Sequence, residues 1–260
     1  MKVDLEWDDD HVFPSVINPD LAFLWQQMND VSVREMEVSE GEEILDVGCG
    51  RAFDAIQLTK KGGECLGLEP SRKMINRAKE RLTKDEIEVT LIQGIGEYLP
   101  FKDCSLDKVM CKGSIDHFPD PSKAVEEMAR VLKPQGKAII VVANFDSLSF
   151  RLGRRLSRVG KILPWGRSAD RKVWQMPADH VYEFNYVFLK RLVTAHFKVE
   201  RSIGISLLFG FPGWGWLLAK LPKGFCLAIL NILDKLARHF PSFSDVILIK
   251  CSPKSKEILA

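Results

Sequence analysis

The sequence predicts an α/β fold in which helices cover both faces of a mostly parallel sheet of seven strands. Short β-rich runs alternate with helical patterns between residues 44 and 145, which is typical of βαβ units. The first run, ILDV at 44–47, ends in glycines and leads directly into a helical pattern. The fifth run, KAIIVVANF at 137–145, is nearly all apolar, as expected of a strand buried on both faces. These observations predict a Rossmann-like, doubly wound sheet with its site beyond the carboxyl ends of the strands.

The other elements are read from periodicity and from capping residues. A helix is expected over 20–36, with Asn18 as its N-cap and Pro19 at its first position. Further helices are expected after the first strand, over 71–85 with Ser71 as N-cap, over 121–132, around 150–161, over 186–196 and around 225–236. Further strands are expected at 64–69, 87–94, 106–114, after residue 196 and at 245–251.

Length and composition suit one domain over 1–260, because 260 residues are enough for one large α/β domain and few for two. The net charge of +2 hides an acidic block at 1–43 and a basic block at 146–175, and the basic block is suited to an anionic surface. Six cysteines without a C-x-x-C pair indicate reduced thiols in a cytoplasmic protein and predict no metal site. The opening MKVDLEWDDDH has no signal-peptide pattern, and prolines and lysines interrupt every long apolar stretch, so no membrane span is expected.

The glycine turn after the first strand leaves two interpretations open. Gly48 and Gly50 form G-x-G, but Phe53 stands where a dinucleotide fingerprint has its third glycine. The turn is therefore either a tight connection without a ligand or the edge of a cofactor site. Glu69, about 20 positions further on at the tip of the next strand, favours the cofactor site, because a carboxylate there can accept both hydroxyls of a ribose.

Four blocks over residues 41–143 resemble the core of the class I S-adenosylmethionine (SAM) dependent methyltransferases. The blocks are ILDVGCG, GLEPSRKMINRAKER, GIGEYLPFKDCSLDKVM and IDHFPDPSKAVEEMARVLKPQGKAIIV. The resemblance is to enzymes that modify small molecules and lipids, similar to the methyltransferase type 11 group. It implies SAM as cofactor, S-adenosylhomocysteine as product and a small-molecule acceptor. The LPF-x-D-x-S-x-D and RVLKP-x-G stretches do not occur in dehydrogenases with a nicotinamide cofactor.

The resemblance also implies which residues hold the cofactor. The turn passes under the methionine part of SAM, Asp46 helps to hold that part, and Glu69 takes the ribose hydroxyls. The full set of expected cofactor residues is Asp46, Gly48, Cys49, Gly50, Glu69, Pro70, Ile95, Gly96 and Glu97. Ile95 replaces the aspartate that usually bonds the adenine amino group, which weakens base discrimination by about 1 kcal/mol. Ala52 replaces a usual glycine, a small change that we expect to be tolerated.

Acid–base residues are expected where the fourth strand ends. Relatives that methylate oxygen often have Glu-His where this chain has Asp116-His117, so His117 is the candidate base and Asp116 either orients it or faces the cofactor. His117 equally suits a packing role against the turn that follows. His180 and Trp214 are candidate substrate contacts, and a helix-capping or solvent-facing His180 is an equal alternative.

Two insertions complete the expected organisation. The chain divides into an N-terminal helical segment (1–40), a SAM-binding core (41–145), a basic insertion (146–184), the rest of the core (185–206 and 245–251) and an apolar helical insertion (207–244). The basic insertion contains an amphipathic helix with Arg151, Arg154, Arg155, Arg158 and Lys161. The insertions form either a lid on the site, a separate apolar core, or a surface for peripheral contact with an anionic membrane.

The expected function is SAM-dependent methyl transfer to a small, apolar or lipid-like acceptor. The alternative is a SAM-binding interaction protein without catalysis, which the missing aspartate at position 95 motivates. Nucleic acid is an unlikely partner, since the basic stretch has no interleaved aromatic residues.

Overall fold

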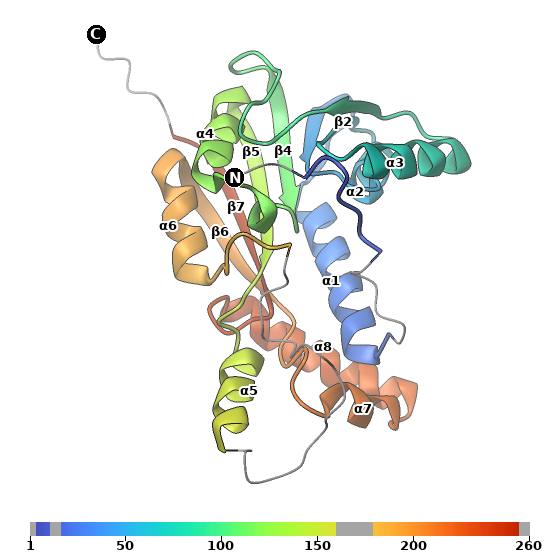
Figure 1. Cartoon of the computed structure of the whole chain (residues 1–260), viewed down its shortest axis with the longest axis vertical. Coiled ribbons are helices and arrows are strands. Elements are labelled where there is room, and N and C mark those ends of the chain that lie inside the picture. Colours follow the sequence, from blue (N-terminus) through green and yellow to red (C-terminus); the bar gives the residue numbers. More distant parts are fainter. Residues whose placement is uncertain (1–3, 11–16, 160–178, 255–260) are drawn as a thin grey trace.

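One seven-stranded sheet runs through the molecule in the order β3-β2-β1-β4-β5-β7-β6 (Figure 1). The computed structural model describes residues 4–10, 17–159 and 179–254. The strands are β1 (Glu43–Val47), β2 (Glu64–Glu69), β3 (Thr90–Gln93), β4 (Leu106–Lys112), β5 (Leu132–Ala143), β6 (Phe197–Ile205) and β7 (Val246–Pro253). The first five strands pair in parallel, and β7 is antiparallel to both β5 and β6. The expected fold class is confirmed.

Helices cover both faces of this sheet (Figure 1). They are α1 (Pro19–Glu35), α2 (Phe53–Thr59), α3 (Arg72–Asp85), α4 (Pro121–Val131), α5 (Leu148–Val159), α6 (Tyr186–His196), α7 (Trp214–Ala219) and α8 (Lys223–His239), with a 3-10 turn η1 (Ile115–His117). Capping residues start several of them. The Ser71 side chain accepts a hydrogen bond from the Met74 N–H at the start of α3, as predicted, and Asp120 caps α4 in the same way.

The strand residues alternate between two hydrophobic cores. On β1, Ile44 packs with α1, α2 and α3, whereas Leu45 and Val47 pack on the face that α4 and α6 cover. The same alternation continues along β4, β5 and β7, because successive side chains of a strand point to opposite faces. A parallel sheet buried on both faces therefore leaves its carboxyl edge, where β1, β2 and β4 end, as the place for a site.

Two strands begin three or more residues away from the expected position, and the other strand ends agree to within two residues. β5 begins at Leu132 rather than at residue 137, since Leu132 pairs with Leu106 before the register shifts and Lys137 pairs with Lys108. The residues between them, with Pro134 and Gly136, form an irregularity in the ladder that helical and strand periodicity do not reveal. β3 is shorter than expected and begins at Thr90.

The apolar insertion extends beyond the carboxyl edge of the sheet, where α7 and α8 lie beside α1 (Figure 1). Phe23 of α1, Leu218 of α7, and Cys226 and Leu230 of α8 form a small separate core. The opposite face of α8 is exposed, and it carries the apolar residues expected to roof the site, including Phe225, Ile232 and Leu236. In this arrangement these three side chains face solvent, and the lid stays a prediction. No helix within the described ranges is both long and apolar enough to span a bilayer.

Two buried carboxylates fasten the insertions to the sheet. One oxygen of Asp245 accepts a hydrogen bond from the Ser149 hydroxyl of α5 (2.9 Å), and the other accepts one from the Phe209 N–H (2.9 Å). Asp234 of α8 accepts a hydrogen bond from the Ser206 N–H (3.0 Å) and pairs with Arg238. Burial raises the pKa of Asp245 to about 7.

Replacing Asp245 with asparagine is expected to remove part of the pH dependence of stability. Between pH 3.8 and about 7 the folded chain holds a proton on Asp245 that the unfolded chain has lost. The wild type therefore loses stability as the pH rises through this window, by at most about 1.4 kcal/mol per pH unit. Asparagine does not titrate, so the variant lacks this contribution. Urea titrations at pH 5 and pH 8 measure the free energy of unfolding of both proteins. The difference, wild type minus variant, should be smaller at pH 8 than at pH 5 by up to about 3 kcal/mol. An equal difference at both pH values would contradict the raised pKa.

Candidate functional site

The turn after β1 is built on close contact with the turn after β4. Gly48 has φ +74°, and a Cβ on this glycine would lie 2.4 Å from the Ser114 Cβ. The Ser114 hydroxyl donates a hydrogen bond to the Val47 carbonyl (2.9 Å), and the Gly48 and Cys49 N–H groups both donate to the Leu68 carbonyl (2.8 and 3.0 Å). The ends of β1, β2 and β4 are thus held together, with glycine required at position 48.

Glu69 ends β2 beside this turn. Its two carboxylate oxygens accept hydrogen bonds from the Gly50 N–H (3.0 Å) and the Ser71 N–H (2.9 Å). Only 5% of Glu69 is exposed, and burial raises its pKa. The strand tip is therefore covered and not solvent-facing. Each oxygen keeps acceptor capacity beyond the single N–H group that it binds.

Asp46 lies in β1, two residues before Gly48, and is 2% exposed. Burial, together with the nearby carboxylate of Asp54, raises its pKa. Its Oδ2 atom has no hydrogen-bond partner among the described residues. A buried acceptor without a donor is costly, so this oxygen is suited to receive a donor from a ligand.

The remaining expected cofactor residues have mixed positions. Gly96 is buried against the Phe118 ring, while Ile95 is only partly buried. Glu97 is buried and its carboxylate accepts a hydrogen bond from the Asp120 N–H (3.1 Å), which gives it a role at the start of α4. Burial raises the pKa of the Cys49 thiol, so this side chain is a neutral packing group. The Pro70 carbonyl accepts a hydrogen bond from the Gln93 side chain (3.1 Å).

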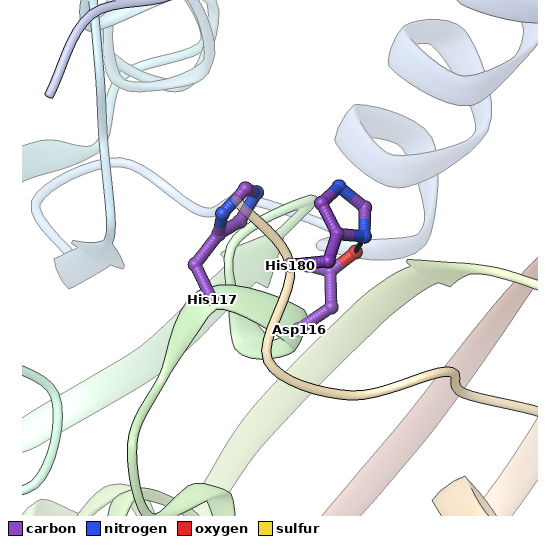
Figure 2. Close-up of side chains that lie close together, drawn as sticks. All are labelled: Asp116, His117 and His180. Carbon is purple, nitrogen blue, oxygen red and sulfur yellow. Dashed lines mark ion pairs between the residues drawn. The ribbon is translucent and has the colours of Figure 1, made fainter. Parts of the chain in front are cut away.

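Asp116, His117 and His180 come together just past β4 (Figure 2). The Asp116 carboxylate faces His180, with 3.1 Å between Oδ2 and Nδ1, and not its neighbour His117. The rings of His117 and His180 lie edge to face, 4.5 Å apart at their centroids. The His117 Nδ1 atom lies 3.1 Å from the Asp179 carbonyl oxygen, which only accepts, so this contact selects the tautomer of the neutral ring that has its proton on Nδ1 and its lone pair on Nε2.

An acidic N-terminal segment, residues 4–10, crosses the site and was not predicted to take part in it. The Trp7 ring packs edge to face on His117 at 5.5 Å, and its indole N–H donates to the Asp179 carboxylate (3.2 Å). The Trp7 carbonyl accepts a hydrogen bond from the Ser71 hydroxyl (2.6 Å). Asp9 pairs with both Arg51 and Arg77 (2.7 and 2.5 Å). The acidic block at 1–43 was the available signal, but its partners are arginines of the core.

The basic insertion and Trp214 lie elsewhere. Arg151 and Arg154 of α5 both pair with Asp146 of their own segment (2.6 and 3.2 Å). Lys161 and the rest of 160–178 lie outside the described residues, as does the Arg158 side chain. Trp214, an expected substrate contact, packs against the small core of α1, α7 and α8. Within the described part of the chain, the ring contacts of His117 and His180 are with Trp7, Phe145 and each other.

Comparison with known families matches residues 45–140 to a methyltransferase domain. These residues form a class I SAM-dependent methyltransferase domain. The chain is 38% identical over 128 residues to a demethylmenaquinone methyltransferase of Staphylococcus carnosus, covering 48% of this chain and 53% of that protein. It is 30% identical over 199 residues to a chloroplastic 2-methyl-6-phytyl-1,4-hydroquinone methyltransferase of Arabidopsis thaliana, covering 75% and 55%. The chain spans about half the length of the curated relatives that it matches.

The fold of the methyltransferase domain agrees with solved structures. The PH0226 protein of Pyrococcus horikoshii superimposes with a TM-score of 0.57 at 19% identity, over 94% of this chain and 97% of that one. The cofactor of this domain family is SAM, and the residues present fit it. The unpartnered Asp46 oxygen suits the amino group of a methionine, and the carboxylate of Glu69 suits the hydroxyls of a ribose.

Replacing Gly48 with alanine should destabilise the methyltransferase domain more than the same change at Gly113. Both glycines have positive φ, +74° and +63°, but a Cβ at position 113 would meet nothing within 4 Å. Gly113→Ala should therefore cost about 1 to 2 kcal/mol of backbone strain alone. Gly48→Ala adds overpacking against Ser114, a further cost of about 1 to 3 kcal/mol. Urea unfolding of both variants measures the difference, and equal losses would show that the Ser114 contact gives way without cost.

Proposed function

We propose that the chain transfers a methyl group from SAM to a small, largely apolar acceptor that binds at the Asp116, His117 and His180 cluster. The observation that carries this proposal is the contact between Gly48 and Ser114. It joins the expected cofactor turn to the segment that begins η1. Asp116, the first residue of the cluster, follows Ser114 by two positions. Bound SAM supplies an activated methyl group on a sulfonium sulfur, so the protein's main task is to position the acceptor.

His117 is the proposed base for an acceptor with an ionisable hydroxyl. Its Nδ1–H is held by the Asp179 carbonyl, which leaves the Nε2 lone pair to take the proton of the acceptor hydroxyl. Asp116 holds His180, and the main-chain carbonyl of Asp116 accepts a hydrogen bond from the Val181 N–H (2.8 Å). These bonds keep the two histidines in fixed relation, so that the acceptor meets a preorganised polar group.

Aromatic surroundings support an apolar acceptor. Trp7 packs on His117, and Phe145 lies 5.8 Å from His180, edge to face. Two of the relatives described above are named for quinone and hydroquinone acceptors. A phenol-like acceptor combines an apolar ring with an ionisable hydroxyl, which matches a cluster of imidazoles and a carboxylate among aromatic rings.

Glu69→Gln is expected to weaken SAM binding by about 1 to 3 kcal/mol, because the ribose hydroxyls lose a charged acceptor. Glu64→Gln, an exposed glutamate at the start of the same strand, serves as the matched control and should bind SAM as the wild type does. Calorimetric titration with SAM and S-adenosylhomocysteine measures both.

Replacing His117 with alanine should lower the turnover while the affinity for SAM is retained. Turnover is measured as transfer of label from methyl-labelled SAM to an extract of apolar acceptors.

Three results would count against the proposal. Absence of SAM binding by the wild type would remove both methyl transfer and the alternative of a non-catalytic SAM-binding protein. Binding without transfer to any apolar acceptor would favour that alternative. Equal losses of SAM affinity and turnover in His117→Ala would assign His117 a structural role.

We further propose that the protein rests on an anionic membrane through α7 and α8, where it would meet a lipid-like acceptor. The exposed face of these helices carries large apolar side chains, and Phe225 and Ile232 are each 59% exposed. The whole exposed set on α7, α8 and the segment after them is Trp216, Leu217, Phe225, Leu227, Ile232, Leu236, Phe240 and Phe243. Phe225, Ile232 and Leu236 share one face of α8 at helical spacing, and an exposed apolar face of this kind is typical of an interaction site.

The charges around this apolar face favour an anionic bilayer over a second copy of the chain. Residues 207–244 contain a single acidic residue, Asp234, which is buried and paired with Arg238. Lys220, Lys223 and Lys235 are exposed beside the apolar residues. Two such faces would bring lysines against lysines, whereas an anionic leaflet attracts each of them by about 1 kcal/mol. The arginines of α5 contribute less than the sequence predicts, because Asp146 neutralises part of their charge.

A double change, Phe225→Ser with Ile232→Ser, should weaken binding to anionic vesicles at least about tenfold, since two exposed apolar side chains no longer enter the interface. Val187→Ser is the matched control, because Val187 is 73% exposed and its helix, α6, lies apart from α7 and α8 (Figure 1). Sedimentation with phosphatidylglycerol vesicles at low and high salt measures the effect. Membrane contact would be refuted if the wild-type protein stayed in the supernatant at low salt. It would also be refuted if the wild type formed dimers and the double change dissociated them.

A further inference from the structure

We propose that Asp116, His117 and His180 form a binding site for one divalent transition-metal ion. Each residue offers one ligand atom, and the three atoms lie within 4.8 Å of one another (Figure 2). Within residues 4–10, 17–159 and 179–254, no second group of histidine, cysteine or acidic side chains has this arrangement. The site deepens the proposed function, because the acceptor would bind beside it.

The Asp116 carboxylate supplies the strongest support. The residue is 3% exposed, and its Oδ1 atom has no hydrogen-bond partner among the described residues. Its Oδ2 atom stands 3.1 Å from the His180 Nδ1 atom. Two neighbouring ligands, each bonded to an ion at about 2.1 Å, stand about 3.0 Å apart at right angles and about 3.4 Å apart in a tetrahedron, so this pair has a spacing close to that of neighbouring ligands. A buried carboxylate with an unpartnered oxygen is in turn stabilised by a cation.

The residues around the cluster orient the ligands as they do in metal sites. The His117 Nδ1–H donates to the Asp179 carbonyl, which directs the Nε2 lone pair away from the main chain. Metal-binding histidines characteristically donate their other ring N–H to such an oxygen. The Val181 N–H binds the Asp116 carbonyl, so the segment that carries His180 is fixed to η1 by main chain. The widest gap, up to 4.8 Å, would have to close to about 3.4 Å in a tetrahedral site, a shift of up to about 1.4 Å that changes of side-chain torsion can supply.

The ligand set indicates the class of ion. Two imidazoles and one carboxylate suit Zn²⁺, Mn²⁺, Fe²⁺ or Co²⁺, whereas Mg²⁺ and Ca²⁺ prefer oxygen ligands. Three protein ligands leave at least one position open, as in catalytic zinc sites. An ion here would lower the pKa of a hydroxyl on the acceptor, and it would occupy the His117 Nε2 atom that otherwise acts as the base.

Titration with Co²⁺ tests the site in the full-length chain without a histidine tag. Co²⁺ is chosen because its visible absorption changes when nitrogen ligands replace water. All proteins carry Cys104→Ser, since Cys104 is the exposed thiol among the cysteines and would itself bind the ion. Asp116→Asn and His180→Gln remove ligands with little change of shape. His239→Gln, an exposed histidine of α8, is the matched control.

The expected result is one equivalent of Co²⁺, with the affinity reduced at least about tenfold in both ligand variants and unchanged in the control. No absorption change, or equal affinity in Asp116→Asn and the control, would overturn the site. The wild type can be treated with a chelator, separated from it, and then tested both for Co²⁺ binding and for methyl transfer. Methyl transfer without Co²⁺ binding would overturn the metal site and leave the proposed transfer intact. Failure to bind SAM, measured separately by calorimetry, would affect only the proposed function.

Discussion

The approach of Ser114 to Gly48 is the contact on which the site depends. Because Gly48 has no Cβ, the turn after β4 can lie directly against the turn after β1, and the Ser114 hydroxyl binds the end of β1. η1 begins at the next residue, so the contact also sets the position of Asp116 and His117. A parallel sheet brings strand ends to one edge, but this contact fixes them at the ångström scale that positioning of reactants requires.

A second constraint comes from segments that join the edge from far along the chain. His180 reaches the cluster because the main chain of 179–181 binds η1 and His117. Residues 4–10 cover the same edge, where Asp9 forms ion pairs with Arg51, just before α2, and with Arg77 of α3. Buried Asp234 and Asp245 hold α8, α5 and the segment between β6 and α7 in place. Carboxylates thus organise much of the surroundings of the site.

Local patterns are enough to predict the sheet and most helices. Ser71 caps its helix as predicted, and Glu69 ends its strand beside the glycine turn. The irregular start of β5 was not predicted, because a register shift arises from pairing between strands and leaves no periodic signal. The helical pattern of α8 was also predicted, but not which face is buried. The buried face of α8 carries Cys226, Leu230, Asp234 and Ala237, with the Ala237 carbonyl against Gly204, and Phe225 lies outside.

The side-chain partners at the site were beyond sequence reasoning for a similar reason. Asp116 and His117 are neighbours in the chain, yet Asp116 faces His180, which lies more than 60 positions away. Short metal motifs depend on regular spacing, so three ligands from two distant segments form no motif. Trp7 and Asp9 were hidden in an acidic block whose partners only the fold brings near.

The central claim is that the glycine turn and the histidine cluster belong to one site. A crystal structure of the complex with S-adenosylhomocysteine tests it most directly. We expect the ribose hydroxyls within hydrogen-bond distance of Glu69 and the sulfur on the side that faces Asp116 and His117. A ligand bound away from Glu69, or one whose sulfur faces away from the cluster, would contradict this account.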